Sequence, residues 1–275
     1  MDLTAAGSGR LAFTTRDPIG PVVAVSAFNH PLNLIVHQVA PAIAVGCPVL
    51  VKPAGDTPLS CQAFVEMLYE AGLPEEWCRF VMSDRESSEK LVTDPRVAFF
   101  SFIGSAGVGW MLRSKLAPGT RCALEHGGVA PVIIDESAGL EAIIPSLLKG
   151  GFYHSGQVCV SVQRIFAPRA QAGDIAQMLA EGASKLIVGN AIDEQVECGP
   201  LIRPAEVDRV AAWVDEAKNA GAKILTGGER LTETTYAPTV LLEPPTNAKI
   251  SNAEVFGPAV CVYGYDDMDE AISQD

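Results

Sequence analysis

The sequence predicts an α/β protein in which a doubly wound parallel sheet is followed by a second α/β domain. Short apolar runs rich in β-branched residues, typical of strands buried on both faces, alternate with amphipathic segments on short connections. With 275 residues, 48% of them apolar, the chain is long enough for two packed cores. The expected strands are residues 22–26, 49–52, 78–82, 98–102 and 120–124, then 132–135, 164–167, 223–225, 239–242 and 259–263.

Helix-end signals and helical periodicity place the helices between these strands. The clearest helix has Thr57 as its expected N-cap and Pro58 at its first position, and it closes at Gly72. Residues 31–45 predict a helix broken near Pro41. Further helices are expected after the glycine-containing segment 103–109 as far as about Leu116, and at about 140–149, 171–186 and 204–220. Residues 11–16 alternate like an exposed strand, for which the sequence offers no partner.

Composition excludes several classes of function. A net charge of −13 without basic clusters argues against a general nucleic-acid or anionic-membrane role. The opening residues contain no apolar leader, and no run approaches the ~18 apolar residues that span a bilayer. Seven cysteines without CxxC spacing predict reduced thiols in a cytoplasmic protein, with no disulfide framework and no metal site. They lie at positions 47, 61, 78, 122, 159, 198 and 261.

Two turns lie where a parallel sheet of this kind binds ligands, beyond the carboxyl ends of its strands. One follows Lys52. In the other, after Phe102, glycines at positions 104, 107 and 109 would let backbone N–H groups at a helix start approach an anion. The spacing departs from G-x-G-x-x-G, so glycines that only allow close helix packing remain an equal reading.

The expected loop at residues 152–159 contains one cysteine, Cys159 at its end, and a glycine that would let the thiol face a ligand. A cysteine nucleophile needs a backbone that lets the sulfur face a ligand, together with a separate base. Gly156 fits the first need. Glu125, before Gly127 and Gly128, fits the second. A buried structural thiol is the alternative.

Seven motifs occur together in the order and approximate spacing of the aldehyde dehydrogenase superfamily, which the chain therefore resembles. They are 27–31 (AFNHP), 52–58 (KPAGDTP), 103–105 (IGS) with 108–109 (VG), 125–128 (EHGG), 156–159 (GQVC), 199–201 (GPL) and 254–258 (EVFGP). The resemblance implies a bridging or oligomerisation strand at 1–20, a Rossmann-like NAD(P)-binding domain at 21–126 and a catalytic domain at 127–275. Family members usually continue beyond both ends of this chain.

The resemblance also implies roles for individual residues. Cys159 is similar to the family's nucleophile, Glu125 to the base that activates the hydrolytic water, and Asn29 to the side-chain donor that stabilises the oxyanion. Lys52 resembles the adenosine-ribose contact, and Ser105 the pyrophosphate contact. The other implied cofactor contacts are Glu254 and Phe256 on the nicotinamide ribose, with Gly104, Val108 and Gly127.

Two positions depart from the pattern. Gly55 stands where NAD-preferring relatives often carry a glutamate that holds both ribose hydroxyls. Its absence makes NADP use plausible, although Asp56 could restore part of the repulsion. His126, at a position more often leucine, is expected to be a buried neutral histidine or to tune Glu125.

The expected function is NAD(P)-dependent oxidation of an aldehyde to a carboxylic acid, in a homodimer or homotetramer. A coenzyme A-acylating relative is the nearest alternative, although Glu125 would be superfluous there. An inactive nucleotide-binding or interaction protein is a second alternative. A thiol hydrolase pairing Cys159 with His154 or His126 is a third, which leaves the cofactor-like motifs unexplained. The identity of the aldehyde cannot be read from the sequence.

Overall fold

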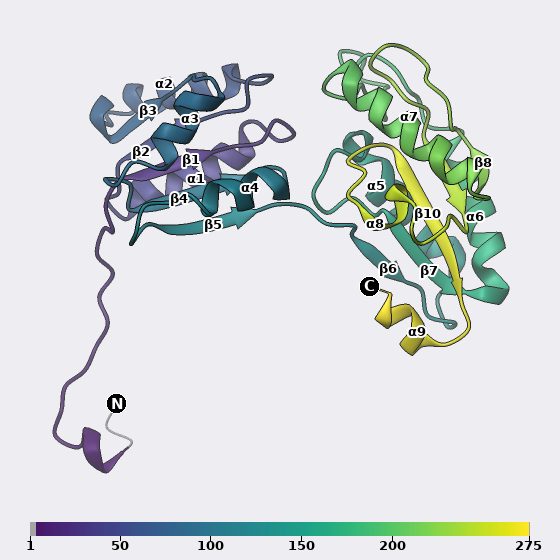
Figure 1. The fold of residues 1–275 in the computed structure, drawn as a ribbon, viewed down its shortest axis with the longest axis horizontal. Coiled ribbons are helices and arrows are strands. Elements are labelled where there is room, and N and C mark those ends of the chain that lie inside the picture. The colour runs from purple at the N-terminus through teal and green to yellow at the C-terminus, as the bar shows by residue number, and fades with distance from the viewer. Residues whose placement is uncertain (1–3, 275) are drawn as a thin grey trace. The chain divides into compact units, whose positions relative to one another are not determined.

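The computed structural model describes residues 4–274 in two compact units. The division falls between Glu125 and His126, one residue before the expected domain boundary. Figure 1 shows that each unit contains one sheet with its own helices. The units are described separately below.

The first unit is a five-stranded sheet in the order β3-β2-β1-β4-β5, with every neighbouring pair parallel. This confirms the doubly wound fold. The order reverses between β1 and β4, which is the switch point where such sheets bind ligands. The strands are β1 (Val22–Val25), β2 (Val49–Lys52), β3 (Cys78–Phe80), β4 (Phe99–Ile103) and β5 (Arg121–Glu125).

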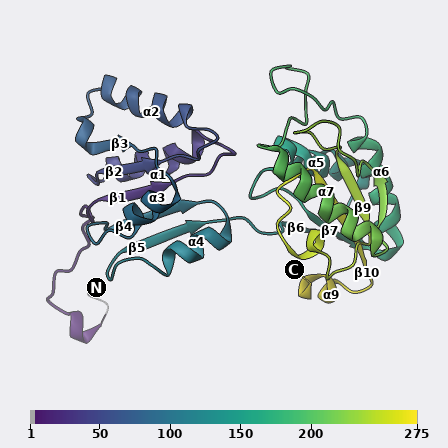
Figure 2. The same ribbon diagram turned by 45° about the horizontal axis from the view of Figure 1, so that its top comes forward.

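Helices cover both faces of this sheet, as Figure 2 shows. Helices α1 (Asn33–Ala44) and α2 (Leu59–Glu70) pack on one face through residues such as Ile35 and Val65. Helices α3 (Arg85–Val92) and α4 (Ala106–Arg113) pack on the other face around Phe100. Burial on both faces explains why these strands are continuous apolar runs.

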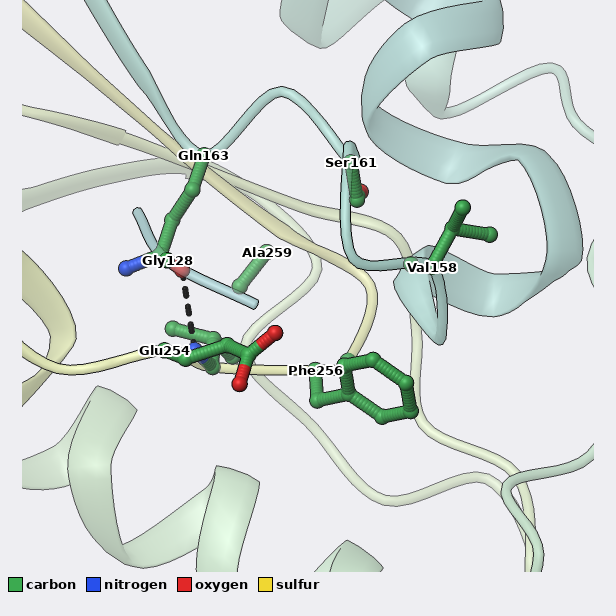
Figure 3. A pocket seen from close by; sticks show the side chains of 10 residues that line it. Gly128, Val158, Ser161, Gln163, Glu254, Phe256 and Ala259 are labelled. Atoms are coloured by element: carbon green, nitrogen blue, oxygen red, sulfur yellow. Dashed lines mark hydrogen bonds between the residues drawn. The ribbon is translucent and has the colours of Figure 1, made fainter. Parts of the chain in front are cut away.

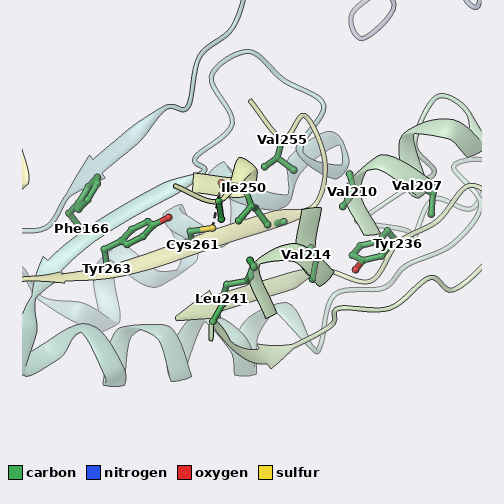
Figure 4. Packing of buried hydrophobic residues seen from close by; sticks show 14 of the residues in the cluster. Phe166, Val207, Val210, Val214, Tyr236, Leu241, Ile250, Val255, Cys261 and Tyr263 are labelled. Carbon is green, nitrogen blue, oxygen red and sulfur yellow. Dashed lines mark hydrogen bonds between the residues drawn. The ribbon is translucent and has the colours of Figure 1, made fainter. Parts of the chain in front are cut away.

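The second unit is a five-stranded sheet in the order β6-β7-β10-β9-β8, parallel except for the β8–β9 pair. Helices α5 and α6 pack on one face, and α7 to α9 pack on the other. Figure 4 shows the cluster of buried residues on the face covered by α7 to α9. The strands are β6 (Pro131–Ile133), β7 (Arg164–Pro168), β8 (Lys223–Thr226), β9 (Thr239–Leu242) and β10 (Ala259–Tyr265). The helices are α5 (Leu140–Phe152), α6 (Arg169–Ala183), α7 (Pro204–Asn219), α8 (Lys249–Asn252) and α9 (Met268–Ser273).

Residues 11–16 have no strand neighbour within the described chain, so pairing of this segment with a segment or subunit outside it stays a prediction. Two local expectations were wrong. Thr57 does not cap α2, whose N-cap is Pro58, and its hydroxyl points to the Phe28 carbonyl at 3.5 Å. Helix α1 runs unbroken through Pro41.

No helix in the described part of the chain is long and apolar enough to cross a membrane.

Candidate active site

In the first unit, four of the expected site residues follow the carboxyl ends of parallel strands. Lys52 ends β2 and Glu125 ends β5, while Asn29 and Ser105 lie just after β1 and β4. Because these strands are parallel neighbours, the four residues lie along one edge of the sheet. Asn29 is buried and Glu125 is exposed.

A cleft of about 280 Å³ opens beside Lys52. The Lys52 ammonium donates to the Pro53 carbonyl at 3.0 Å, and burial lowers its pKa. The cleft has an apolar wall and a polar rim, a combination typical of small-molecule sites. The wall consists of Val25, Val92, Val108, Met111 and Leu112, and the rim of Lys52, Ser83, Asp84, Arg85, Ser88 and Glu89.

The glycines after β4 serve packing more than anion binding. The Gly104 N–H donates to the Glu125 carbonyl at 3.1 Å, so it is not available to a phosphate. A Cβ at Gly104 would lie 2.8 Å from the Phe102 ring, and one at Gly109 would lie 2.9 Å from it. The first amides of α4, after its N-cap Ser105, are the ones that have no partner within the helix.

In the second unit, the expected site residues precede their strands. Gly127 comes a few residues before β6, Cys159 before β7 and Glu254 before β10. These strands are parallel neighbours, so the three residues lie at one amino-terminal edge of the sheet. The expected site residues therefore lie at the carboxyl ends of the strands in the first unit and at the amino-terminal ends in the second.

The loop before Cys159 has an unusual backbone. His154, Ser155 and Gly156 follow one another with φ of 57°, 56° and 71°, a left-handed region that costs a non-glycine residue of order 1–2 kcal/mol. A Cβ at Gly156 would lie 2.1 Å from the Gly257 carbonyl oxygen. Glycine is therefore required at position 156, as the sequence suggested.

Hydrogen bonds tie this loop to the 199–202 segment. The Ser155 hydroxyl donates to the Gly199 carbonyl at 2.6 Å. The Gln157 side chain donates to the Pro200 carbonyl at 3.2 Å and accepts from the Ile202 N–H at 2.9 Å. These bonds offset the backbone strain and hold the loop in one conformation.

Replacing Gly156 with alanine is expected to destabilise the second unit by more than about 2 kcal/mol, because left-handed strain and the clash with Gly257 add. Denaturant unfolding measures the loss. Gly173 on α6 is the matched control, since a Cβ there would meet nothing within 4 Å. Gly173→Ala is expected to leave stability unchanged or raise it by roughly 0.5–1 kcal/mol. Equal losses in the two variants would contradict this reading.

Exposure distinguishes Cys159 from the other cysteines. All seven lie in the described part of the chain and are free; five are buried, Cys122 is half-buried and Cys159 is exposed. Burial raises the pKa of Cys61 and of Cys261 to about 12, so these thiols stay protonated and inert. Within the described chain, Cys159 is the only cysteine in an exposed position.

Glu254 lines a small pocket together with Phe256, Gly128 and Val158 (Figure 3). Its Oε1 is buried and accepts no hydrogen bond within the described structure. A Cβ at Gly127 would lie 1.7 Å from this oxygen, so any larger residue there would displace the Glu254 carboxylate.

The pKa of Glu254 is raised by burial, while the positive charges of Arg209 and His126 oppose that shift. His126 is half-buried and its charge lowers the pKa of Glu254, so it is not the buried histidine that the sequence suggested; an effect of His126 on Glu125 stays a prediction. Phe256 has a φ of 46°, a strained value for a non-glycine residue.

Sequence reasoning missed several residues at these edges. The rim residues Arg85 and Ser83 were not singled out, nor were the side chains that anchor the Glu254 segment, Gln163 and Arg209. Arg85 opens a short polar helix whose N-cap Asp84 accepts from the Ser87 N–H, a signal that could have been found.

Comparison with known proteins decides the family. The family model described as "Aldehyde dehydrogenase family" matches residues 2–274. The chain belongs to this family. It is 41% identical to 3-sulfolactaldehyde dehydrogenase of Priestia aryabhattai, over 98% of this chain and 57% of the relative. The chain spans about half the length of the curated relatives it matches.

Solved structures of family members have the same fold. Betaine aldehyde dehydrogenase from Staphylococcus aureus in complex with NAD+ matches with a TM-score of 0.89 and 31% identity, over 94% of this chain and 52% of that one. Glyceraldehyde-3-phosphate dehydrogenase GapN from Methanocaldococcus jannaschii complexed with NADP matches with a TM-score of 0.90 and 32% identity, over 94% and 57%.

Proposed function

We propose that the protein oxidises an aldehyde to a carboxylic acid with NAD+ or NADP+. The observation that carries the proposal is the exposed thiol of Cys159, on a strained and hydrogen-bonded loop beside the Glu254 pocket. Membership of the aldehyde dehydrogenase family supports the same reaction class.

The residues present fit a nicotinamide dinucleotide. Glu254 Oε1 is a buried acceptor without a donor, which suits a ribose hydroxyl. Lys52 lies on the rim of a cleft with an apolar wall that suits an adenosine. Ser105 and the first amides of α4 suit the pyrophosphate, with Val108 in the cleft wall. Gly127 and Phe256 complete the part of the proposed site that would hold the nicotinamide and its ribose.

The chemistry begins at Cys159, whose thiolate adds to the aldehyde carbon and gives a thiohemiacetal. The Asn29 amide and the Cys159 backbone N–H donate to the developing oxyanion. When bound, the oxidised dinucleotide supplies the acceptor for the hydride that leaves the aldehyde carbon. Cys159 is then acylated as a thioester. Glu125 takes a proton from water, which attacks the thioester, releases the acid and restores the thiolate.

The proposed reaction is tested by absorbance at the reduced-nicotinamide band. The panel is 3-sulfolactaldehyde, betaine aldehyde and glyceraldehyde 3-phosphate, the aldehydes in the relatives' names. They carry a sulfonate, a quaternary ammonium and a phosphate, so the panel also samples charge classes. We expect reduced dinucleotide and free acid without coenzyme A. Product that forms only as a coenzyme A ester would contradict the proposal.

We expect measurable turnover with NADP+. Gly55 leaves open space where a carboxylate would repel the 2′-phosphate, since a Cβ there meets nothing within 4 Å. Arg85 and Lys52 lie on the rim of the neighbouring cleft. Gly55→Glu is expected to lower kcat/KM for NADP+ on the order of tenfold relative to NAD+. Strict use of NAD+ by the wild-type protein in steady-state kinetics would refute the prediction.

We further propose that the protein works in a reducing compartment and forms a symmetric oligomer. Seven free cysteines, five of them buried, suit the cytoplasm. A homodimer or homotetramer follows from the family resemblance, and light scattering on the purified protein tests it.

A further inference from the structure

Glu254 and Phe256 can contact a nicotinamide ribose only if the backbone that carries them is held in a defined conformation. The residue between them, Val255, is 1% exposed and lies in the second unit's core. Its backbone N–H and its backbone C=O are each bonded to a side chain from elsewhere in the unit. These two anchors come from different elements and lie outside the proposed reaction steps.

The first anchor is Gln163, which lies just before β7 and is buried. Its Oε1 accepts from the Val255 N–H at 2.9 Å, the bond drawn in Figure 3. Its Nε2 donates to the Ile250 carbonyl at 3.0 Å and to the Ala253 carbonyl at 2.8 Å. One amide thus fixes three backbone groups of the segment that carries Glu254.

The second anchor is Arg209 on α7. Its guanidinium donates to the Val255 carbonyl at 2.7 Å and to Glu206 at 2.9 Å, and it lies over the Trp213 ring with 4.9 Å to the centroid. The side chain is 29% exposed. Arg209 is therefore held from three sides, and its position is well defined.

The two bonds fix two successive peptide planes. The Val255 N–H belongs to the peptide that joins Glu254 to Val255, and the Val255 carbonyl belongs to the peptide that joins Val255 to Phe256. With both planes held, φ and ψ of Val255 are set, and with them the directions in which the chain leaves toward Glu254 and toward Phe256, whose own φ is a strained 46°. Because hydrogen bonds with a charged donor are roughly twice as strong as neutral ones, the Arg209 bond is suited to holding strain.

We propose that Gln163 and Arg209 are positioning residues that hold Val255 so that Glu254 and Phe256 are aimed at the nicotinamide ribose of the bound dinucleotide. The inference rests on the proposed function. It assigns a cofactor-binding task to α7, a helix outside all the motifs that carry the family resemblance. Loss of either anchor weakens dinucleotide binding and leaves the reactivity of Cys159 in place.

The pH dependence of dinucleotide binding distinguishes the proposed role of Arg209 from a purely structural one, because a purely structural residue would not change it. Two cationic groups act on the Glu254 carboxylate, Arg209 from α7 and His126 from the segment before β6. An ionised Glu254 accepts the ribose hydroxyls, so binding weakens as pH falls through the pKa of Glu254. Removing Arg209 raises that pKa further. The weakening is then expected to begin at a higher pH.

The test compares Arg209→Met with Glu206→Gln. The methionine keeps an apolar stem against Trp213 but loses the Val255 bond, whereas Glu206→Gln removes the ion pair and leaves that bond. We measure the dissociation constant for NAD+ and NADP+ by calorimetry across pH, the rate of Cys159 alkylation by iodoacetamide, and Tm. Arg209→Met is expected to raise the dissociation constant about tenfold, and Glu206→Gln to leave it unchanged. Cys159 alkylation stays at the wild-type rate in both.

Arg209→Lys is the conservative variant. It tests the role of Arg209 in dinucleotide binding if Arg209→Met does not fold. A lysine keeps the charge but lacks the planar fork that serves Val255 and Glu206 together, so partial recovery of binding is expected. Unchanged dinucleotide binding in a folded Arg209 variant would overturn the inference, as would a parallel loss of Cys159 alkylation. A wild-type protein that binds neither dinucleotide would overturn the proposed function itself, together with this inference.

Discussion

Replacing Cys159 with serine is expected to abolish aldehyde oxidation, with a loss of roughly 10⁴-fold or more in kcat. A serine hydroxyl stays protonated at neutral pH and is a much weaker nucleophile than a thiolate, so the first bond to the aldehyde carbon does not form at a useful rate. Formation of reduced dinucleotide, followed by absorbance, measures the loss. Binding of the dinucleotide is expected to persist, because Glu254, Phe256 and Lys52 are unchanged.

Cys122→Ser is the matched control for this experiment. Cys122 is the next most accessible cysteine, half-buried in β5, and its replacement is expected to keep turnover near the wild-type rate. If aldehyde oxidation persists in Cys159→Ser but is lost in Cys122→Ser, then the nucleophile is Cys122 in the first unit and not Cys159.

Replacing Glu125 with glutamine is expected to separate the two halves of the reaction. Acylation of Cys159 needs no hydrolytic base, so about one equivalent of reduced dinucleotide per site forms in a burst. Hydrolysis then stalls and the steady-state rate falls by roughly 10²–10⁴-fold, the usual contribution of a positioned base. Rapid-mixing absorbance resolves the burst, and chromatography of the free acid follows the second half.

An exposed glutamate close along the chain provides the control. Glu136 lies just after β6, and Glu136→Gln is expected to show neither a burst nor a slow phase. Steady-state turnover that is unaltered in Glu125→Gln would remove Glu125 from the base role. Added hydroxylamine, an external nucleophile, is expected to speed the Glu125→Gln steady state because it replaces the missing activated water.

The strands could be predicted well because each is a local apolar run. Residues 49–52 and 239–242 match β2 and β9 at both ends, since their β-branched side chains fit positions buried on both faces. Helix α3 was missed, because it is short and polar and buries only Val92. Helix ends were less predictable than strands, as Thr57 shows: its pattern fits a cap, yet its hydroxyl points to a distant carbonyl.

The residues proposed for the site differ in the same way in how well the sequence could identify them. Cys159, Glu125 and Glu254 stand in short motifs that sequence alone identifies. Gln163 and Arg209 do not stand in such motifs. Gln163 bonds to a residue 92 positions away in the chain, and Arg209 to one 46 positions away. Nothing local distinguishes such a glutamine from a solvated one. Exposure is also a tertiary property, so the sequence could not tell which of seven cysteines faces solvent.

The central claim is that the aldehyde carbon is oxidised while it is bonded to Cys159. The most direct measurement is peptide mass spectrometry of Glu125→Gln, quenched in acid after incubation with an aldehyde substrate and NAD+ or NADP+. The account predicts an acyl group on the peptide that contains Cys159, in amounts equal to the reduced dinucleotide formed. Reduced dinucleotide without acylated Cys159, or an acyl group on another cysteine, would contradict it.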